Sequence, residues 1–240
     1  MNVKDHYQNH LGNIYSWMAG DFNELLRMNS RFFSDNHIAP RANGIAFDLG
    51  CAHGPQSIAL AKAGFTVHAV DFNRPLLAEL EARVSNLKVQ TVENDILHFL
   101  NDVSEKAELI VCMGDTLTHL ESLADVASFI KSISDHLIPG GKVVVSFRDL
   151  TTELKAEDRF IAVRSDDSRI LTCFLEYFPD YVMVHDLLYE KTGGEWIKSI
   201  SSYPKLRLSP NMIADHFAIN GIKVIKEEFN RGMVYMIGCV

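Results

Sequence analysis

The chain has 240 residues, of which 47% are hydrophobic, so it can bury one core of ordinary domain size. Its formal net charge of -8 leaves no broad basic surface for a phosphate backbone, which argues against nucleic acid as its main partner. Because the four cysteines lie far apart without a Cys-x-x-Cys spacing, and no apolar run is long enough for a signal peptide or a membrane span, we expect a cytoplasmic protein with reduced thiols, no metal and no membrane partner.

Residues 1–40 carry apolar side chains at intervals of three and four residues, which predicts an N-terminal helical cap that breaks at Gly20. Beyond it, short apolar runs alternate with helical patterns. The runs that we interpret as strands are 45–49, 65–70, 87–92, 109–113 and 142–147. Strands that alternate with helices form parallel sheets, so we expect residues 45–150 to be a doubly wound, Rossmann-like α/β core.

Apolar residues from 123 to 137 follow a helical period, and Pro139-Gly140-Gly141 is predicted to form a turn before the fifth strand. Residues 155–206 then change character, because turn signals at 166–168, 179–180 and 193–194 separate segments rich in β-branched and aromatic residues. This pattern predicts an inserted antiparallel meander of about four strands.

Residues 207–240 contain a helix capped by Ser209 and two apolar runs, 222–229 and 233–239. Only residues 230–232 connect these runs, which is too short for a parallel crossover. The last strand must therefore run antiparallel to its neighbour, in a mostly parallel sheet. We expect the chain to be a single domain with these four parts.

The first predicted strand leads into Asp48, Gly50, Ala52 and Gly54, directly before a predicted helix. Glycines allow a ligand to approach the backbone, and a helix start favours a carboxylate or phosphate. Asp71 ends the second strand, where a carboxylate can accept hydrogen bonds from ribose hydroxyls. A nucleoside site is the favoured interpretation, and a tight turn beside a surface aspartate is the alternative.

The alternate spacing of the acidic and small residues resembles motif I of the class I S-adenosylmethionine-dependent methyltransferases, with Ala52 in place of the usual middle glycine. The nicotinamide fingerprint fits less well, because its third and sixth positions hold Ala52 and Pro55. The resemblance implies S-adenosylmethionine as cofactor, with Asp95 on the adenine amino group and Ile96 against the ring. Further cofactor contacts implied by it are Tyr15, Phe72, Asn94, Met113 and Gly114.

Gly114 to Leu120 resembles the Gly-Asn-Ser-x-x-His-Leu loop of the glycine N-methyltransferase group, with Asp115 in place of the asparagine. That group has an arginine that pairs with the substrate carboxylate, and Arg148 lies at the matching position. The likeness implies methyl transfer to nitrogen or oxygen of a small molecule that carries a carboxylate. His119 or Asp115 would accept a proton, and Tyr7, Tyr15, His119 and Arg148 would bind the substrate.

Several alternatives remain open from the sequence. His119 could anchor its loop, and Arg148 could lie on the surface. The chain could be a catalytically silent, methyltransferase-like binding subunit, or a nicotinamide-dependent dehydrogenase. The inserted strands could form a lid or a homodimer contact, and their aromatic residues could line a substrate pocket or form a second small core.

Overall fold

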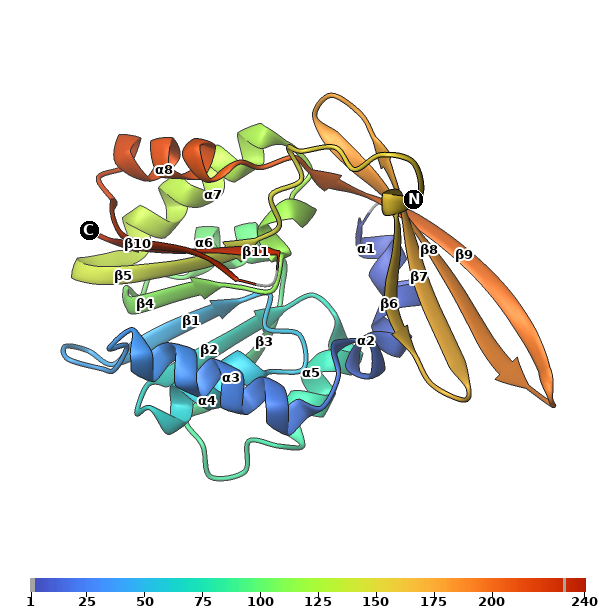
Figure 1. The fold of residues 1–240 in the computed structure, drawn as a ribbon. Helices are drawn as coiled ribbons and strands as arrows, with labels where there is room; N and C mark the ends of the chain where they lie inside the picture. Colours follow the sequence, from blue (N-terminus) through green and yellow to red (C-terminus); the bar gives the residue numbers. More distant parts are fainter. Residues whose placement is uncertain (1–2, 231) are drawn as a thin grey trace.

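The computed structural model describes residues 3–230 and 232–240. Figure 1 shows an α/β core, a smaller antiparallel sheet beside it, and the N-terminal helices between the two. Met1, Asn2 and Arg231 lie outside the described residues, so the start of the predicted cap and the middle of the connection 230–232 are not part of this description.

The central sheet has seven strands in the order β10-β11-β5-β4-β1-β2-β3. The strands are β1 (Ile45–Leu49), β2 (Thr66–Asp71), β3 (Val89–Glu93), β4 (Ala107–Cys112), β5 (Leu137–Phe147), β10 (Lys223–Asn230) and β11 (Met233–Cys239). β11 pairs antiparallel with both β5 and β10, whereas the pairs among β1 to β5 are parallel. The predicted reversal of the last strand is confirmed.

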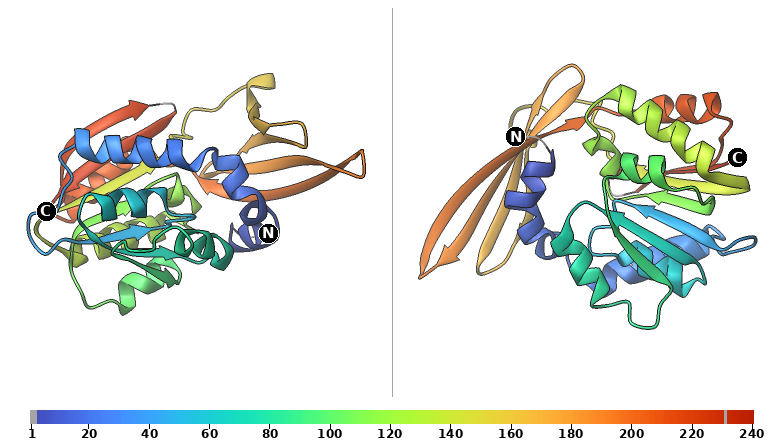
Figure 2. Two further views of the ribbon diagram at one scale, coloured as in Figure 1. Left: turned by 90° about the horizontal axis from the view of Figure 1, so that it is seen from below. Right: turned by 180° about the vertical axis from the view of Figure 1, so that it is seen from behind.

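Helices cover both faces of this sheet (Figures 1 and 2). One layer has α3 (Phe22–Asp35), α4 (Pro55–Lys62) and α5 (Arg74–Glu81), and the other has α6 (Ile96–Asp102), α7 (Leu123–His136) and α8 (Pro210–Ile219). Side chains alternate between the two layers along each strand: Phe47 packs in one apolar cluster and Ala46 in the other. This arrangement explains why the central strands are apolar at consecutive positions.

Polar side chains fix where most of these helices begin. The residues Asp21, Asn73, Asp95, Ser122 and Ser209 each accept a hydrogen bond from a backbone N–H in the first turn of α3, α5, α6, α7 and α8, respectively. None of the described helices is long and apolar enough to cross a membrane.

The predicted turn at Pro139-Gly140-Gly141 is wrong, because these residues belong to β5. They form an irregular stretch of that strand: Ala107 pairs with Leu137, and Leu109 already pairs with Lys142. The amide of Gly140 donates to the carbonyl of Val240 at 3.2 Å, and the amide of Val240 donates to Gly141 at 3.1 Å. Pairing with the end of the chain therefore keeps this segment in the sheet.

The inserted sheet consists of β6 (Phe160–Ser165), β7 (Arg169–Tyr177), β8 (Tyr181–Thr192) and β9 (Glu195–Leu206), which pair antiparallel in sequence order. The predicted four-stranded meander is confirmed. Its strands β6 and β9 expose Phe160, Trp196, Ile197 and Ile200, each at least 45% exposed. The homodimer stays a prediction, which this apolar surface favours.

The N-terminal segment, residues 3–19, lies between the core and the inserted sheet (Figures 1 and 2). It consists of α1 (Val3–His6), a π-helix (Tyr7–Leu11) and α2 (Gly12–Ala19), and it ends at Gly20, whose φ is 104°. Leu11 and Ile14 pack against Leu171 and Leu188 of the inserted sheet. The helical break at Gly20 is confirmed, but the π-helix was not expected.

Candidate functional site

The carboxyl ends of β4, β1, β2 and β3 lie side by side because these strands are neighbours in a parallel arrangement. Ligands of open α/β sheets bind at this edge. The loops that follow these strands carry most of the predicted site residues, and the N-terminal segment and the inserted sheet lie beyond them (Figure 1). The candidate site is therefore bounded by three separate parts of the chain.

The glycines after β1 serve close packing. Gly50 has a φ of 81°, and a Cβ there would lie 2.5 Å from Cγ2 of Thr116. Gly54 has a φ of 86°, and a Cβ there would lie 2.1 Å from a methyl carbon of Leu80 on α5. Glycine is therefore needed at these positions for close packing, in addition to the approach of a ligand that the sequence suggested. Ala52 adopts a φ of 48° although it has a side chain.

Asp71 holds two loops together. Its Oδ2 accepts the amide of Ala52 at 2.8 Å, and its Oδ1 accepts the amide of Asn73 at 2.8 Å. The residue is only 8% exposed, and burial raises the pKa of its carboxyl in spite of these bonds. Each carboxylate oxygen has two lone pairs, so both can accept one further hydrogen bond.

Asp48 is the most deeply buried carboxylate of the site. It is 1% exposed, and its Oδ2 accepts the hydroxyl of Ser57 at 2.5 Å. Burial raises the pKa of Asp48 to about 7, and the bond from Ser57 opposes that rise. A positive group bound next to it would therefore favour its ionised form.

The residues after β3 join the same edge. The amide of Asn94 donates to the carbonyl of Asp71 at 3.1 Å, which ties the ends of β2 and β3 together. Asp95 caps α6 through its Oδ1, which accepts the amide of Leu97 at 2.8 Å. Ile96 is 7% exposed and packs in the core.

Aromatic rings from three parts of the chain converge above the ends of β2 and β4. The ring of Tyr7 lies 6.1 Å from that of Tyr15, 5.7 Å from Phe72 and 5.7 Å from His119. Tyr203 of β9 stacks on His119 at 5.5 Å. Burial raises the pKa of the hydroxyl groups of Tyr7, Tyr15 and Tyr203, which keeps them neutral.

His119 lies in the middle of these rings, and its Nδ1 is buried without a hydrogen-bond partner among the described residues. Burial, with the positive charge of Lys205 second, lowers the pKa of His119 to about 3. The imidazole is therefore neutral at pH 7, where one of its two nitrogens carries a lone pair.

Asp115 is fully engaged by other parts of the protein. It is 5% exposed and has a φ of 79°, with Oδ1 accepting the amide of Arg148 at 2.9 Å and Oδ2 accepting Nζ of Lys205 at 2.5 Å. Burial alone would raise the pKa of Asp115, but the positive charge of Lys205 and these bonds lower it below the usual range. Asp115 therefore stays ionised and paired.

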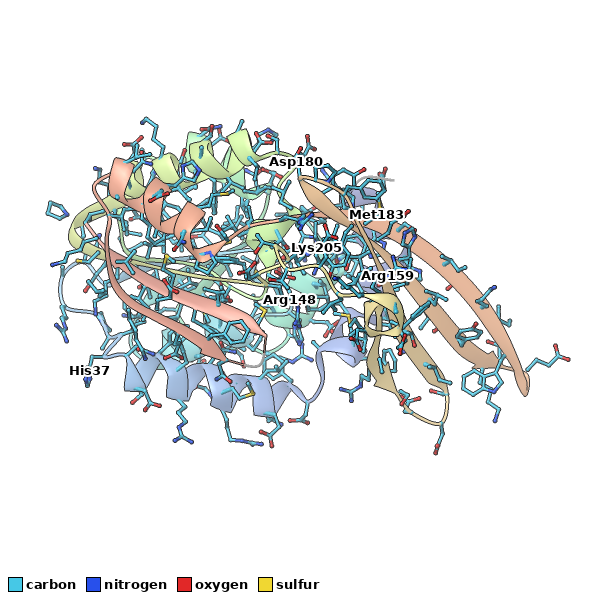
Figure 3. All side chains as sticks on the ribbon, turned by 45° about the horizontal axis from the view of Figure 1, so that its top comes forward. His37, Arg148, Arg159, Asp180, Met183 and Lys205 are labelled. Carbon is cyan, nitrogen blue, oxygen red and sulfur yellow. The ribbon has the colours of Figure 1, made fainter. Side chains whose placement is uncertain are left out.

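Arg148 follows β5, and Figure 3 shows it with Lys205 near the junction of the core and the inserted sheet. Its side chain is 52% exposed, and its Nε lies 3.9 Å from Oδ2 of Asp115. Nearby, Met113 is buried and the amide of Gly114 donates to Oγ of Ser146 at 2.9 Å. The predicted site residues thus lie along one edge of the sheet, except for Tyr7 and Tyr15, whose rings reach this edge from the N-terminal segment. Gly54 packs toward α5.

Sequence reasoning missed Lys205, Tyr203 and Asp186, which all come from the inserted sheet. None of them belongs to a motif, and their positions are fixed only by strand pairing. His6, which is fully buried, was also missing from the predicted site. Among the described residues, no group of three or more His, Cys, Asp or Glu side chains is placed to hold a metal ion.

Residues 46–141 match the family described as "Methyltransferase domain". The cypemycin N-terminal methyltransferase of a Streptomyces species is 32% identical over 102 residues, which cover 42% of this chain and 41% of that protein. The ubiquinone biosynthesis O-methyltransferase of Proteus mirabilis strain HI4320 is 27% identical over 135 residues, which cover 54% and 53%. The chain spans about half the length of these curated relatives.

A crystal structure of an S-adenosylmethionine-dependent methyltransferase from Clostridium acetobutylicum ATCC 824 superposes with a TM-score of 0.75 at 16% identity. The match covers 96% of each chain, so it extends well beyond the central sheet. At this low identity the likeness establishes the fold. It confirms the predicted Rossmann-like α/β class with a reversed strand and an added antiparallel sheet.

The loop after β1 predicts opposite effects for two substitutions. Gly50→Ala is expected to lower the free energy of unfolding by about 2–3 kcal/mol, because the new Cβ meets Thr116 at a positive φ. Ala52→Gly is expected to raise it by about 1 kcal/mol, because glycine relieves a left-handed conformation. Urea denaturation monitored by circular dichroism measures both, and equal destabilisation by the two changes would contradict this account.

The neutral, buried imidazole of His119 predicts a pH dependence of stability. Its pKa is about 3 in the folded protein and about 6.5 in the unfolded chain, so the unfolded state binds the extra proton between these values. Stability is therefore lost as the pH falls below 6.5. As the pH falls through this window, the free energy of unfolding of the wild type should decrease by up to about 1.4 kcal/mol per pH unit more than that of His119→Gln. If the free energies of unfolding of the two proteins change in parallel between pH 6.5 and 4.5, the buried neutral imidazole of His119 is contradicted.

Proposed function

Residues 46–141 place this chain in the class I S-adenosylmethionine-dependent methyltransferase family, and from that premise we propose that it transfers a methyl group from this cofactor to nitrogen or oxygen of a small molecule. The main support for a methyl acceptor bound at this site is the Nδ1 of His119, which is buried without a hydrogen-bond partner among the described residues. A buried polar atom without a partner is unfavourable unless a ligand supplies one.

The residues at the sheet edge fit the cofactor. Asp71 has free lone pairs for the two ribose hydroxyls, and Asp48 offers a carboxylate to the ammonium group of the methionine part. Asp95 and Ile96 would hold the adenine. The other residues that we assign to this site are Tyr15, Gly50, Ala52, Gly54, Phe72, Asn94, Met113 and Gly114. When bound, the cofactor supplies a methyl group that a sulfonium makes electrophilic.

His119 is the residue that we assign to the acceptor. Its neutral imidazole would accept a hydrogen bond from the N–H or O–H of the acceptor, so that the lone pair of that atom is oriented toward the methyl carbon. The proton that the acceptor loses would pass to solvent when the product leaves, because an imidazole with a pKa of about 3 orients the acceptor but does not hold its proton. The rings of Tyr7 and Tyr203 exclude water from this position.

The geometry favours His119 over Asp115 in this role. Both oxygens of Asp115 already accept hydrogen bonds, from Lys205 and from the amide of Arg148. The Nδ1 of His119, in contrast, is buried without a hydrogen-bond partner among the described residues, so the imidazole has a lone pair that is free for the acceptor. We therefore assign Asp115 to holding the loop and not to the proton.

The position of Arg148 favours a substrate that carries a carboxylate. Lys205 neutralises Asp115 at 2.5 Å, whereas Nε of Arg148 is 3.9 Å away from the same carboxylate. One positive charge is therefore left over at the junction of the core and the inserted sheet. A half-exposed guanidinium can bind a carboxylate through two parallel hydrogen bonds.

Calorimetry with S-adenosylhomocysteine tests the cofactor site. We expect the wild type to bind it and Asp71→Asn to bind at least about tenfold more weakly, because the side-chain nitrogen that replaces one carboxylate oxygen accepts neither a ribose hydroxyl nor one of the two loop amides. Asp71→Ala is a poorer test, because it also leaves the amides of Ala52 and Asn73 without their acceptor. Asp102→Asn, an exposed aspartate at the end of α6, is the control and should bind as the wild type does.

Turnover of labelled cofactor with a panel of small amines, hydroxyl compounds and their carboxylates separates an enzyme from a catalytically silent binding subunit. An enzyme should label at least one compound, and His119→Gln should slow that reaction while S-adenosylhomocysteine still binds. Binding without any turnover would support the silent subunit.

Cofactor affinity should depend on pH through Asp48. With a pKa of about 7 in the free protein, Asp48 must lose its proton below that pH before it pairs with the ammonium group. The affinity for S-adenosylhomocysteine should therefore fall by up to about tenfold per pH unit below 7. Calorimetry from pH 5.5 to 8.5 measures this slope. Asp48→Asn should bind more weakly at pH 8 and without that slope, and an equal slope in the variant would contradict the assignment.

A further inference from the structure

The inner face of the inserted sheet carries a row of buried polar residues. Cys173 of β7 pairs with Asp186 of β8, and Asp186 pairs with Ser201 of β9. Asp186 is 2% exposed and Ser201 is 5% exposed. The thiol of Cys173 donates to Oδ1 of Asp186 at 3.1 Å. A carboxylate buried this deeply needs further partners.

His6 of the N-terminal segment completes this row. It is fully buried, and its Nδ1 lies 2.6 Å from the hydroxyl oxygen of Ser201. Its Nε2 lies 3.3 Å from Oδ2 of Asp186, an ion-pair distance without the alignment of a hydrogen bond. Because each ring nitrogen faces a different partner on a different strand, the plane of the imidazole is fixed.

The ring of His6 starts a stack that ends at His119. The centroids of His6 and Tyr203 are 4.0 Å apart with 24° between the planes, and those of Tyr203 and His119 are 5.5 Å apart with 15° between the planes. The three rings are thus almost parallel. Asp186 and Ser201 hold the first ring, the first ring supports the second, and the second supports the ring that faces the site.

The charges around this stack come from every element that packs on it. The titratable groups nearest to it are Asp115, Asp186, Lys205, His10 and Tyr7. Lys205 and His6 both oppose protonation of His119, whereas Asp115 and Asp186 favour it. His6 and Asp186 thus have opposite effects on the protonation of His119.

We propose that His6 and Asp186 form a positioning pair that acts through Tyr203 to orient His119, so that the buried nitrogen of His119 faces the methyl acceptor. The inference rests on the proposed function, because it gives His119 the acceptor role. His6 and Asp186 touch neither the acceptor nor the cofactor, and their effect passes through the ring stack. Neither residue was among the predicted site residues, and they lie far apart in the sequence.

The test compares Asp186→Asn and His6→Gln with Ser16→Ala. Asp186→Asn keeps the side-chain volume and removes the charge. Ser16→Ala is the control, because the hydroxyl of Ser16 ties the same N-terminal segment to Glu79 on α5, at the opposite side from the stack. All three changes loosen this segment, but only the first two alter the ring stack.

The first measurement is by NMR on protein with labelled histidine and bound S-adenosylhomocysteine, so it needs no known substrate. We expect proton contacts between the rings of His119 and Tyr203 in the wild type and in Ser16→Ala. In Asp186→Asn and His6→Gln these contacts should weaken and the ring nitrogen shifts of His119 should change. If His6→Gln does not fold, the result for Asp186→Asn alone decides the test. A His119 spectrum unchanged in Asp186→Asn would overturn the proposal.

The second measurement uses the acceptor found by labelled turnover. The two stack variants should lose kcat by on the order of a hundredfold, since a displaced reacting group costs about that much, while their KM for S-adenosylmethionine is unchanged. An equal loss in Ser16→Ala would overturn the positioning role. Failure of the wild type to bind S-adenosylhomocysteine would instead contradict the proposed function, whatever the His119 spectrum shows.

Discussion

A carboxylate that is 5% exposed must be paired, and the pairing of Asp115 determines much of the structure around it. Its partners are Nζ of Lys205 on the inserted sheet and the amide of Arg148 at the end of β5. One charged group thus joins the loop after β4, the end of β5 and β9. Without Lys205, the carboxylate of Asp115 would be a buried charge that no positive group compensates. The positive φ of Asp115 persists because these contacts hold it.

The N-terminal segment depends on the same sheet from the other side. It packs Leu11 and Ile14 on the inserted sheet, places His6 against side chains of β8 and β9, and presents Tyr7 to His119. The rings around His119 therefore come from segments almost 200 residues apart in sequence, because Tyr7 and Tyr203 both lie against it. The carboxylates proposed to bind the cofactor, in contrast, come from the ends of neighbouring strands of one sheet.

This difference explains what the sequence could predict. The central strands are buried on both faces, so their apolar runs are recognisable without knowledge of their neighbours. Asp48, Asp71 and Asp95 follow such runs directly. Lys205, Tyr203 and Asp186 lie on strands that are buried on one face only, and local sequence does not show which face meets the site. Pro139 to Gly141 was misread because its partner, Val240, lies at the far end of the chain.

The π-helix of the N-terminal segment sets the direction in which His6 faces. A π turn contains one residue more than an α turn, so Tyr7–Leu11 takes up one extra residue within the turn itself. If the same five residues formed an ordinary α-helix, everything before them would rotate by about 100° around the helix axis. His6 would then turn away from Asp186 and Ser201 while its identity stayed the same. The wide turn is therefore as necessary for the contacts of His6 as its imidazole is.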